Sequence, residues 1–135
     1  MEPKEKKAFS LVARIGSFKH AFRGVYIFVK NTHNSWVEIF ASIIFIILGF
    51  YFSISHEEWL SLIICIFVLI MAEAFNTGME VHMNLTSPNE HPFARDTKDI
   101  AAGAVFIAVV MTVIIALMIF IPKIITCIHV IQYRV

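Results

Sequence analysis

Residues 59–81 read WLSLIICIFVLIMAEAFNTGMEV, and this stretch decides the fold class. As a helix with ~1.5 Å of rise per residue, it is long enough to cross a ~30 Å hydrocarbon core. Residues 37–54 and 100–121 form two further apolar runs of similar length. Only helices and closed barrels satisfy the backbone in lipid, and these runs lack the strict alternation of barrel strands. The sequence therefore predicts an all-α membrane protein with three transmembrane helices.

The overall composition points the same way. The chain has 135 residues, of which 59% are hydrophobic, and its mean hydropathy is +0.78. This apolar fraction is far above that of an ordinary soluble domain. The net charge is only +1, and no basic stripe carries interleaved aromatic residues, so we expect no nucleic-acid partner. We expect a single domain over residues 1–135.

A different pattern precedes the first predicted span. Between residues 9 and 29, apolar side chains recur at helical spacing, and most of the basic and hydroxyl residues fall elsewhere on the helix. This pattern is typical of an amphipathic helix that lies in the membrane interface, with its basic residues toward anionic headgroups. We predict such a surface helix over about residues 5–30.

Basic residues in the flanking segments predict the orientation. The turn at residues 55–58 has none, whereas the loop at residues 83–98 carries Arg95 and Lys98. Most of the basic residues precede the first span: Lys4, Lys6, Lys7, Arg14, Lys19, Arg23 and Lys30. The positive-inside rule then places the N-terminus and the second loop in the cytoplasm, and the first turn and the C-terminus outside. Trp59 would anchor the second span at the outer interface.

Three polar residues, Glu73, Asn76 and Glu80, interrupt the second apolar run. Offsets of three and seven residues return to nearly the same helical face, so they form one polar stripe about 10 Å long. Glu73 lies about 21 Å from Trp59 along the helix, in the inner third of the bilayer, and Glu80 reaches the cytoplasmic surface. A carboxylate at that depth is costly and marks a functional site, unless Glu73 is protonated and only holds helices together by hydrogen bonds.

Lys98 and Asp99 stand where the third predicted span begins. Asp96 and Asp99 have the spacing of a capping box, so we expect Asp96 to cap the helix. An ammonium group beside the unpaired N–H groups of a helix N-terminus suits a phosphate. Two carboxylates, an amide and a lysine at one membrane surface can hold a divalent cation with a polyphosphate. This combination fits phosphoryl transfer to a lipid hydroxyl, although the GxxxxGK[ST] motif of a P-loop is absent.

The stretch EAFNTGME at residues 73–80 resembles the E-x-x-N-[ST]-x-[IL]-E signature of the small bacterial diacylglycerol kinase and undecaprenol kinase family. Ser87-Pro88, His91-Pro92 and the stretch KDIAAGAV at residues 98–105 are similar to the second loop and third-helix start of that family. The resemblance covers most of the chain. It implies a homotrimer in the bacterial cytoplasmic membrane, each protomer having one surface helix and three transmembrane helices.

The same resemblance implies transfer of the γ-phosphoryl group of ATP, with Mg²⁺, to a lipid alcohol, for which undecaprenol is slightly favoured over diacylglycerol. Glu73 would be the general base and Glu80 would hold magnesium. The remaining residues that the resemblance places at the nucleotide are Asn76 and Lys98 at the phosphates, Asp99, Glu90 and His91 around it, and Ser17 and Arg14 closing over it from the surface helix.

Two departures from the family pattern concern the metal site. Thr32 stands where the family usually has a glutamate, and Asn84 stands where it usually has an aspartate. Glu38 is the nearest acidic residue to the first gap, but it lies about two turns further along. A family member that binds nucleotide or lipid without catalysis therefore stays open. So does an oligomeric ion or proton pathway lined by Glu73 and Glu80, although residues 100–121 contain no ionisable side chain.

Overall fold

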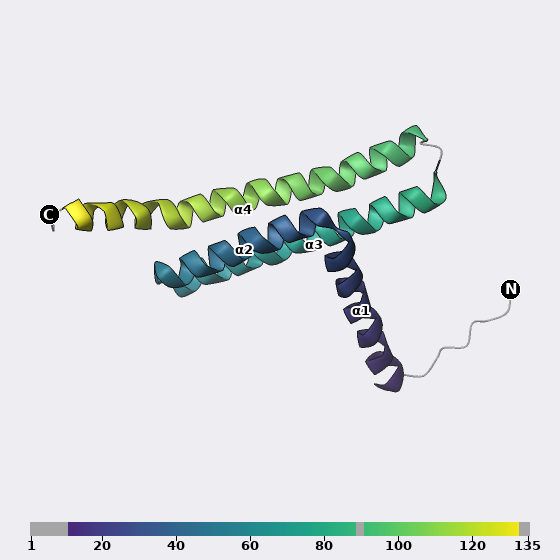
Figure 1. Cartoon of the computed structure of the whole chain (residues 1–135), viewed down its shortest axis with the longest axis horizontal. Helices are drawn as coiled ribbons and strands as arrows, with labels where there is room; N and C mark the ends of the chain where they lie inside the picture. The colour runs from purple at the N-terminus through teal and green to yellow at the C-terminus, as the bar shows by residue number, and fades with distance from the viewer. Residues whose placement is uncertain (1–10, 89–90, 133–135) are drawn as a thin grey trace.

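The computed structural model describes the backbone of residues 11–88 and 91–132, and the side chains of the same residues except 11–15, 31, 33 and 34. The described residues form four helices and no strand, which confirms the predicted all-α class. The helices are α1 (Leu11–Asn31), α2 (His33–Tyr51), α3 (His56–Thr86) and α4 (Pro92–Gln132) (Figure 1).

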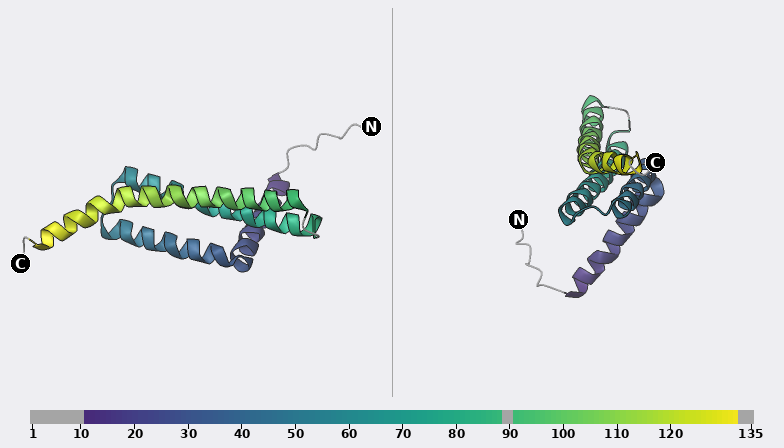
Figure 2. Two further views of the ribbon diagram at one scale, coloured as in Figure 1. Left: turned by 90° about the horizontal axis from the view of Figure 1, so that it is seen from above. Right: turned by 90° about the vertical axis from the view of Figure 1, so that its left-hand side faces the viewer.

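Helices α3 and α4 form a long antiparallel hairpin, and α2 lies beside the first part of α3 (Figures 1 and 2). At the α1–α2 junction the chain bends by 96°, so α1 leaves the bundle at nearly a right angle. This is the geometry that an interfacial helix needs when the helix after it crosses the membrane. Since α2 begins only partway along α3, the last turns of α3 and the first turns of α4 project beyond it.

The turn between α2 and α3 is tightly built. Ser53 has a φ of 48°, and the Ile54 N–H donates to the Gly49 carbonyl at 3.2 Å. Ser55 and Glu58 then form a reciprocal capping box at the start of α3. Gly49 is needed here because a Cβ at this position would meet the Trp59 ring at 2.7 Å.

Apolar packing is concentrated at the end of the bundle that contains this turn. The buried cluster comprises Ile54, Leu62, Ile66, Ala116, Ile119 and Phe120. On α4, Ala108, Thr112 and Ala116 are buried at four-residue spacing, and such small side chains let two helix backbones approach closely within lipid. The opposite half of the bundle instead buries the polar residues Glu73 and Asn76.

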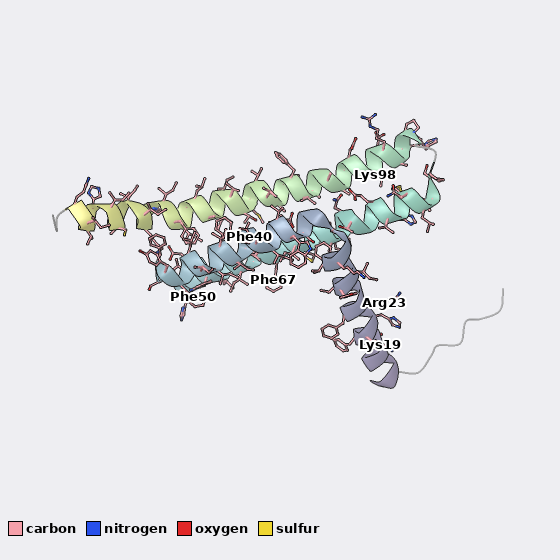
Figure 3. The ribbon with its side chains drawn as sticks, viewed as in Figure 1. Lys19, Arg23, Phe40, Phe50, Phe67 and Lys98 are labelled. Carbon is pink, nitrogen blue, oxygen red and sulfur yellow. The ribbon has the colours of Figure 1, made fainter. Side chains whose placement is uncertain are left out.

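The outer surface of the bundle is apolar, as a lipid-facing surface must be. Phe40, Phe50 and Phe67 are all exposed along α2 and α3 (Figure 3). Among the described residues, α3 and α4 are each long and apolar enough to cross a membrane. Helix α2 meets this test only when it is taken together with α1 across their bend, so the first of the three spans stays a prediction.

Several helix ends differ from the sequence expectation. Helix α3 continues to Thr86, and α4 begins at Pro92, so the loop between them is much shorter than predicted. Asp96 therefore lies inside α4 and does not cap it, and Lys98 is not at the helix N-terminus but in the second turn. Helix α4 also continues through Pro122 to Gln132, and its last turns bend away from the line of the helix (Figure 2).

Candidate functional site

Glu73 and Asn76 lie on the buried face of α3. Glu73 is 2% exposed and Asn76 is 7% exposed, and the Asn76 side chain hydrogen-bonds to Glu73. The Asn76 amide group donates this bond, because its Oδ1 has no hydrogen-bond partner. A buried acceptor without a partner costs about 1–3 kcal/mol, so this oxygen is a candidate acceptor for a donor or a cation.

Glu80 lies on the same side of α3 as Glu73 but is exposed. The difference arises because α2 begins at His33 and the Thr32–Thr77 contact places this start beside Thr77, so α2 runs alongside Glu73 and not alongside Glu80. Thr32 marks this boundary, since its hydroxyl oxygen lies 3.3 Å from that of Thr77. Thr32 therefore faces α3 between Asn76 and Glu80.

A polar pocket of about 700 Å³ lies where α3 ends and α4 begins. Within its lining, the Lys98 ammonium donates to Asn84 Oδ1 at 2.7 Å. Because asparagine is neutral, this bond holds the lysine in place without cancelling its charge, so the charge remains available to an anion. The pocket is lined by Asn84, Ser87, Pro88, Pro92, Ala94, Arg95 and Lys98.

An apolar groove of about 380 Å³ lies deeper along the same hairpin. Asn76 contributes to its lining, so the amide that holds Glu73 also faces the groove. Thr97 lines the groove and the next residue, Lys98, lines the polar pocket, so both spaces are bordered by the first two turns of α4. The groove is lined by Ala72, Phe75, Asn76, Met79, Thr97, Ile100, Ala101 and Ala104.

The residues present fit a magnesium ion that arrives with a polyphosphate. Within the described part of the chain, no three acidic, histidine or cysteine side chains gather to hold a metal ion by themselves. Magnesium is usually bound by one or two carboxylates together with substrate phosphates. The exposed Glu80 carboxylate can supply such a ligand, and the Asn76 Oδ1 is a further oxygen without a partner.

The other predicted nucleotide residues are not gathered at these pockets within one chain. Asp99 is exposed on α4 and lies 3.9 Å from Arg95, so it does not pair with Lys98. His91 caps α4, since its Nδ1 accepts the Phe93 N–H at 3.3 Å. Ser17 lies on α1, about 20 Å of helix before Lys30 at the bend, and Arg14 lies further still.

Two predicted residues fall wholly or partly outside this description. Glu90 lies outside the described residues, and the side chain of Arg14 does as well. Their predicted contacts with the nucleotide stay predictions.

The structure adds three residues that the sequence did not assign to the site. Asn84 holds Lys98, and Arg95 lines the polar pocket from the first turn of α4. Glu38 lies on α2, and its Oε2 is buried without a hydrogen-bond partner. Proline is common at the first helical position, so Pro92 was the available signal that Arg95 and Lys98 share one helix.

Comparisons with known proteins show the family of the chain. Residues 19–120 match the profile of the prokaryotic diacylglycerol kinase family. The chain belongs to this family. Its relatives include the undecaprenol kinase of Bacillus subtilis (strain 168), with 36% identity over 79% of this chain and 87% of that protein. The diacylglycerol kinase of Helicobacter pylori (strain ATCC 700392 / 26695) is 24% identical over 79% of this chain and 89% of that protein.

No solved structure matches the chain. Membership in the prokaryotic diacylglycerol kinase family makes the protein a lipid kinase and a membrane enzyme that uses ATP. This assignment argues against the ion pathway that the sequence left open.

Proposed function

We propose that the protein transfers the γ-phosphoryl group of ATP to the hydroxyl of undecaprenol at the cytoplasmic face of the bacterial inner membrane. The observation that carries this proposal is the pair of spaces on the α3–α4 hairpin, both bordered by the first two turns of α4. One is polar and contains Lys98, and the other is apolar and contains Asn76. A water-soluble phosphate donor fits the first and a lipid alcohol fits the second.

Glu73 is the general base in this proposal. Its carboxylate is buried, and Asn76, which lines the apolar groove, orients it by a hydrogen bond. A base in this place takes the proton of the lipid hydroxyl as the oxygen attacks the γ-phosphorus atom in line with the leaving group. Burial excludes water, which would compete with the lipid for the phosphoryl group.

Lys98 and Arg95 supply positive charge to the phosphates in the polar pocket. Glu80, exposed beyond the start of α2, would hold the magnesium ion that accompanies ATP, and such an ion would supply charge neutralisation to the phosphates. We further propose a homotrimer, because α1 carries Ser17 and Arg14 away from the pockets of its own chain. The α1 helix of a neighbouring protomer would then bring them to the nucleotide.

A panel of lipid acceptors tests the proposal. Purified protein in vesicles is given labelled ATP with magnesium and, in separate reactions, undecaprenol or diacylglycerol. We expect label in undecaprenol first, in keeping with the 36% identity to an undecaprenol kinase. If only diacylglycerol becomes labelled, the acceptor is diacylglycerol and not undecaprenol. If the folded protein labels neither lipid, the kinase proposal is wrong.

A further inference from the structure

Residues 123–132, here called the α4 tail, extend past the buried apolar cluster at the turn end of the bundle. Helix α4 has 41 residues, so at ~1.5 Å per residue it is about twice as long as a ~30 Å hydrocarbon core. Lys98 and Lys123 lie about 37 Å apart along it, and Lys123 pairs with Glu58 of α3 at 3.0 Å. Because an ion pair is costly inside hydrocarbon, the pair marks the edge of the core, and the tail begins there.

The tail has one apolar side and one more polar side. At about 100° per residue, Thr126 and His129 lie away from its isoleucines. The isoleucines continue a stripe that begins within the predicted third span, where exposed apolar side chains face lipid. The stripe recurs at alternating spacings of three and four residues, and its members are all exposed: Ile114, Leu117, Ile121, Ile124, Ile128 and Ile131.

Pro122, at the start of the tail, determines the direction in which the tail bends. A proline ring inside a helix crowds the carbonyl four residues earlier, here that of Met118, so the helix opens on that side and bends toward the other. At about 100° per residue, Ile124 and Ile131 lie almost opposite Pro122. The tail, which leaves the line of α4 in Figure 2, therefore bends toward its own apolar stripe.

The side of the tail that carries Lys123 faces the rest of its own chain. An open groove of about 430 Å³ lies there, lined by Phe52, Pro122, Lys123, Thr126 and Cys127. The isoleucines of the stripe are not among these lining residues, and they are exposed. Within the described part of the chain, the stripe is therefore left uncovered along the tail.

We propose that the α4 tail is a membrane anchor that lies on the leaflet at the α2–α3 turn. Its isoleucine stripe inserts among the lipids, and Thr126 and His129 face water. Lipid is the occupant that fits, because the stripe continues the lipid-facing surface of α4 and the tail bends toward it. A second copy paired along the whole stripe would need a straight helix, which Pro122 interrupts.

The anchor adds to the chain a feature that the family assignment does not cover, since the family match ends at residue 120. Helix α1 is predicted to lie at one surface of the membrane, and the tail lies at the other. The two interfacial segments would fix how deeply the spanning helices sit in the bilayer. This proposal does not depend on which lipid the protein phosphorylates.

Spin labels at neighbouring positions of the tail test the anchor. In a Cys127→Ser protein in vesicles, single cysteines replace Ile124, Thr126, Ile128 or His129, and the buried Cys65 stays unlabelled. Size-exclusion chromatography selects folded protein before reconstitution. All four positions are exposed in the isolated chain, so any difference between them reports what covers the tail.

We expect the labels at Ile124 and Ile128 to collide with oxygen, which dissolves in lipid. Their access to a water-soluble nickel chelate should be at least about threefold lower than that of the labels at Thr126 and His129. Equal access of the chelate to all four labels would place the tail in water and overturn the proposal. It would also be overturned if all four were shielded from the chelate and open to oxygen, since the tail would then continue the span. Shielding of the Ile128 label from both reagents, with spin–spin broadening, would instead place a second copy on the stripe and overturn the anchor.

Discussion

Glu73 and Glu80 share one side of α3 but lie in different surroundings. Glu73 is covered by α2 and held by Asn76, whereas Glu80 is exposed beyond the start of α2. The sequence spacing predicted their common side correctly. It did not predict their different exposure, because that depends on where α2 begins beside α3.

Glu73→Gln and Glu80→Gln should therefore fail in different ways. A base acts in the transition state, so Glu73→Gln should lower kcat about 10²- to 10⁴-fold with little loss of Mg-ATP binding. Glu80→Gln should weaken Mg-ATP binding as well, because it removes a metal ligand. Turnover assays with calorimetric binding of Mg-ATP measure both effects, and equal loss of binding in the two variants would show that the roles are wrongly assigned.

Glu58, just outside the predicted second span, gives a stability prediction that depends on pH. Its pKa lies below the ordinary value of 4.5, first because it accepts the Ser55 backbone N–H and then because it accepts from Lys123 at 3.0 Å. A lowered pKa in the folded state stabilises the fold above pH 4.5, and this stabilisation is lost as the pH falls through the folded-state pKa.

Thermal unfolding of wild type and Glu58→Gln in detergent measures this contribution. At pH 7 the variant should be less stable by under about 1 kcal/mol, since the pair is partly exposed and screened by solvent. The difference should shrink as the pH falls below 4.5 and through the folded-state pKa of Glu58. A difference that grows on acidification would contradict the assignment.

The ends of α3 and α4 were harder to predict than their existence. Long apolar runs are an unambiguous signal, so the spanning helices follow directly from residues 59–81 and 100–121. Helix α4, however, begins eight residues before Ile100 in a polar segment, where hydropathy carries no information. Pro92 looked like a loop residue, although it occupies the first helical position and begins α4.

Contacts between helices were also not predicted from the sequence. The Lys98–Asn84 bond joins residues from two helices, and the Thr32–Thr77 contact depends on the alignment of α2 with α3. Periodicity within one helix predicts which face a residue occupies but not its level beside another helix. For this reason the Lys98–Asn84 bond was not predicted from the sequence.

Gly49→Ala tests the close approach of α2 and α3 at their turn. The new Cβ would lie 2.7 Å from the Trp59 ring, so the variant should lose about 1–3 kcal/mol of stability through overpacking. Gly24→Ala is the matched control, because nothing lies within 4 Å of its new Cβ and alanine favours a helix. Unfolding in detergent should rank Gly24→Ala at or above the wild type, and a stable Gly49→Ala would mean that the turn is looser than described.

The whole chain combines a steep bend, a tight turn and a hairpin that projects beyond α2. The bend and the apolar surface fit a surface helix followed by spanning helices, as the composition predicted. The orientation of the chain in the membrane was predicted from the distribution of basic residues alone. In the structure, the ion pair between Lys123 and Glu58 places Lys123 at the same end of the bundle as the turn that is predicted to lie outside.

The two native cysteines can test this orientation. Cys65 is buried, and Cys127 is half-buried on α4 beyond Lys123. A membrane-impermeant maleimide should label Cys127 in intact spheroplasts and should not label Cys65. Cys127→Ser should abolish the signal, and labelling of the wild type in inverted vesicles alone would reverse the predicted orientation.

The separation of the two spaces on the α3–α4 hairpin has a kinetic consequence. In the proposed reaction, ATP reaches the polar pocket by diffusion in three dimensions through water. The lipid alcohol reaches the apolar groove by lateral diffusion in the two dimensions of the bilayer. The enzyme therefore responds to the mole fraction of its acceptor in the bilayer. Adding inert phospholipid should slow the reaction, whereas diluting the same vesicles at saturating ATP should leave the turnover of each enzyme unchanged.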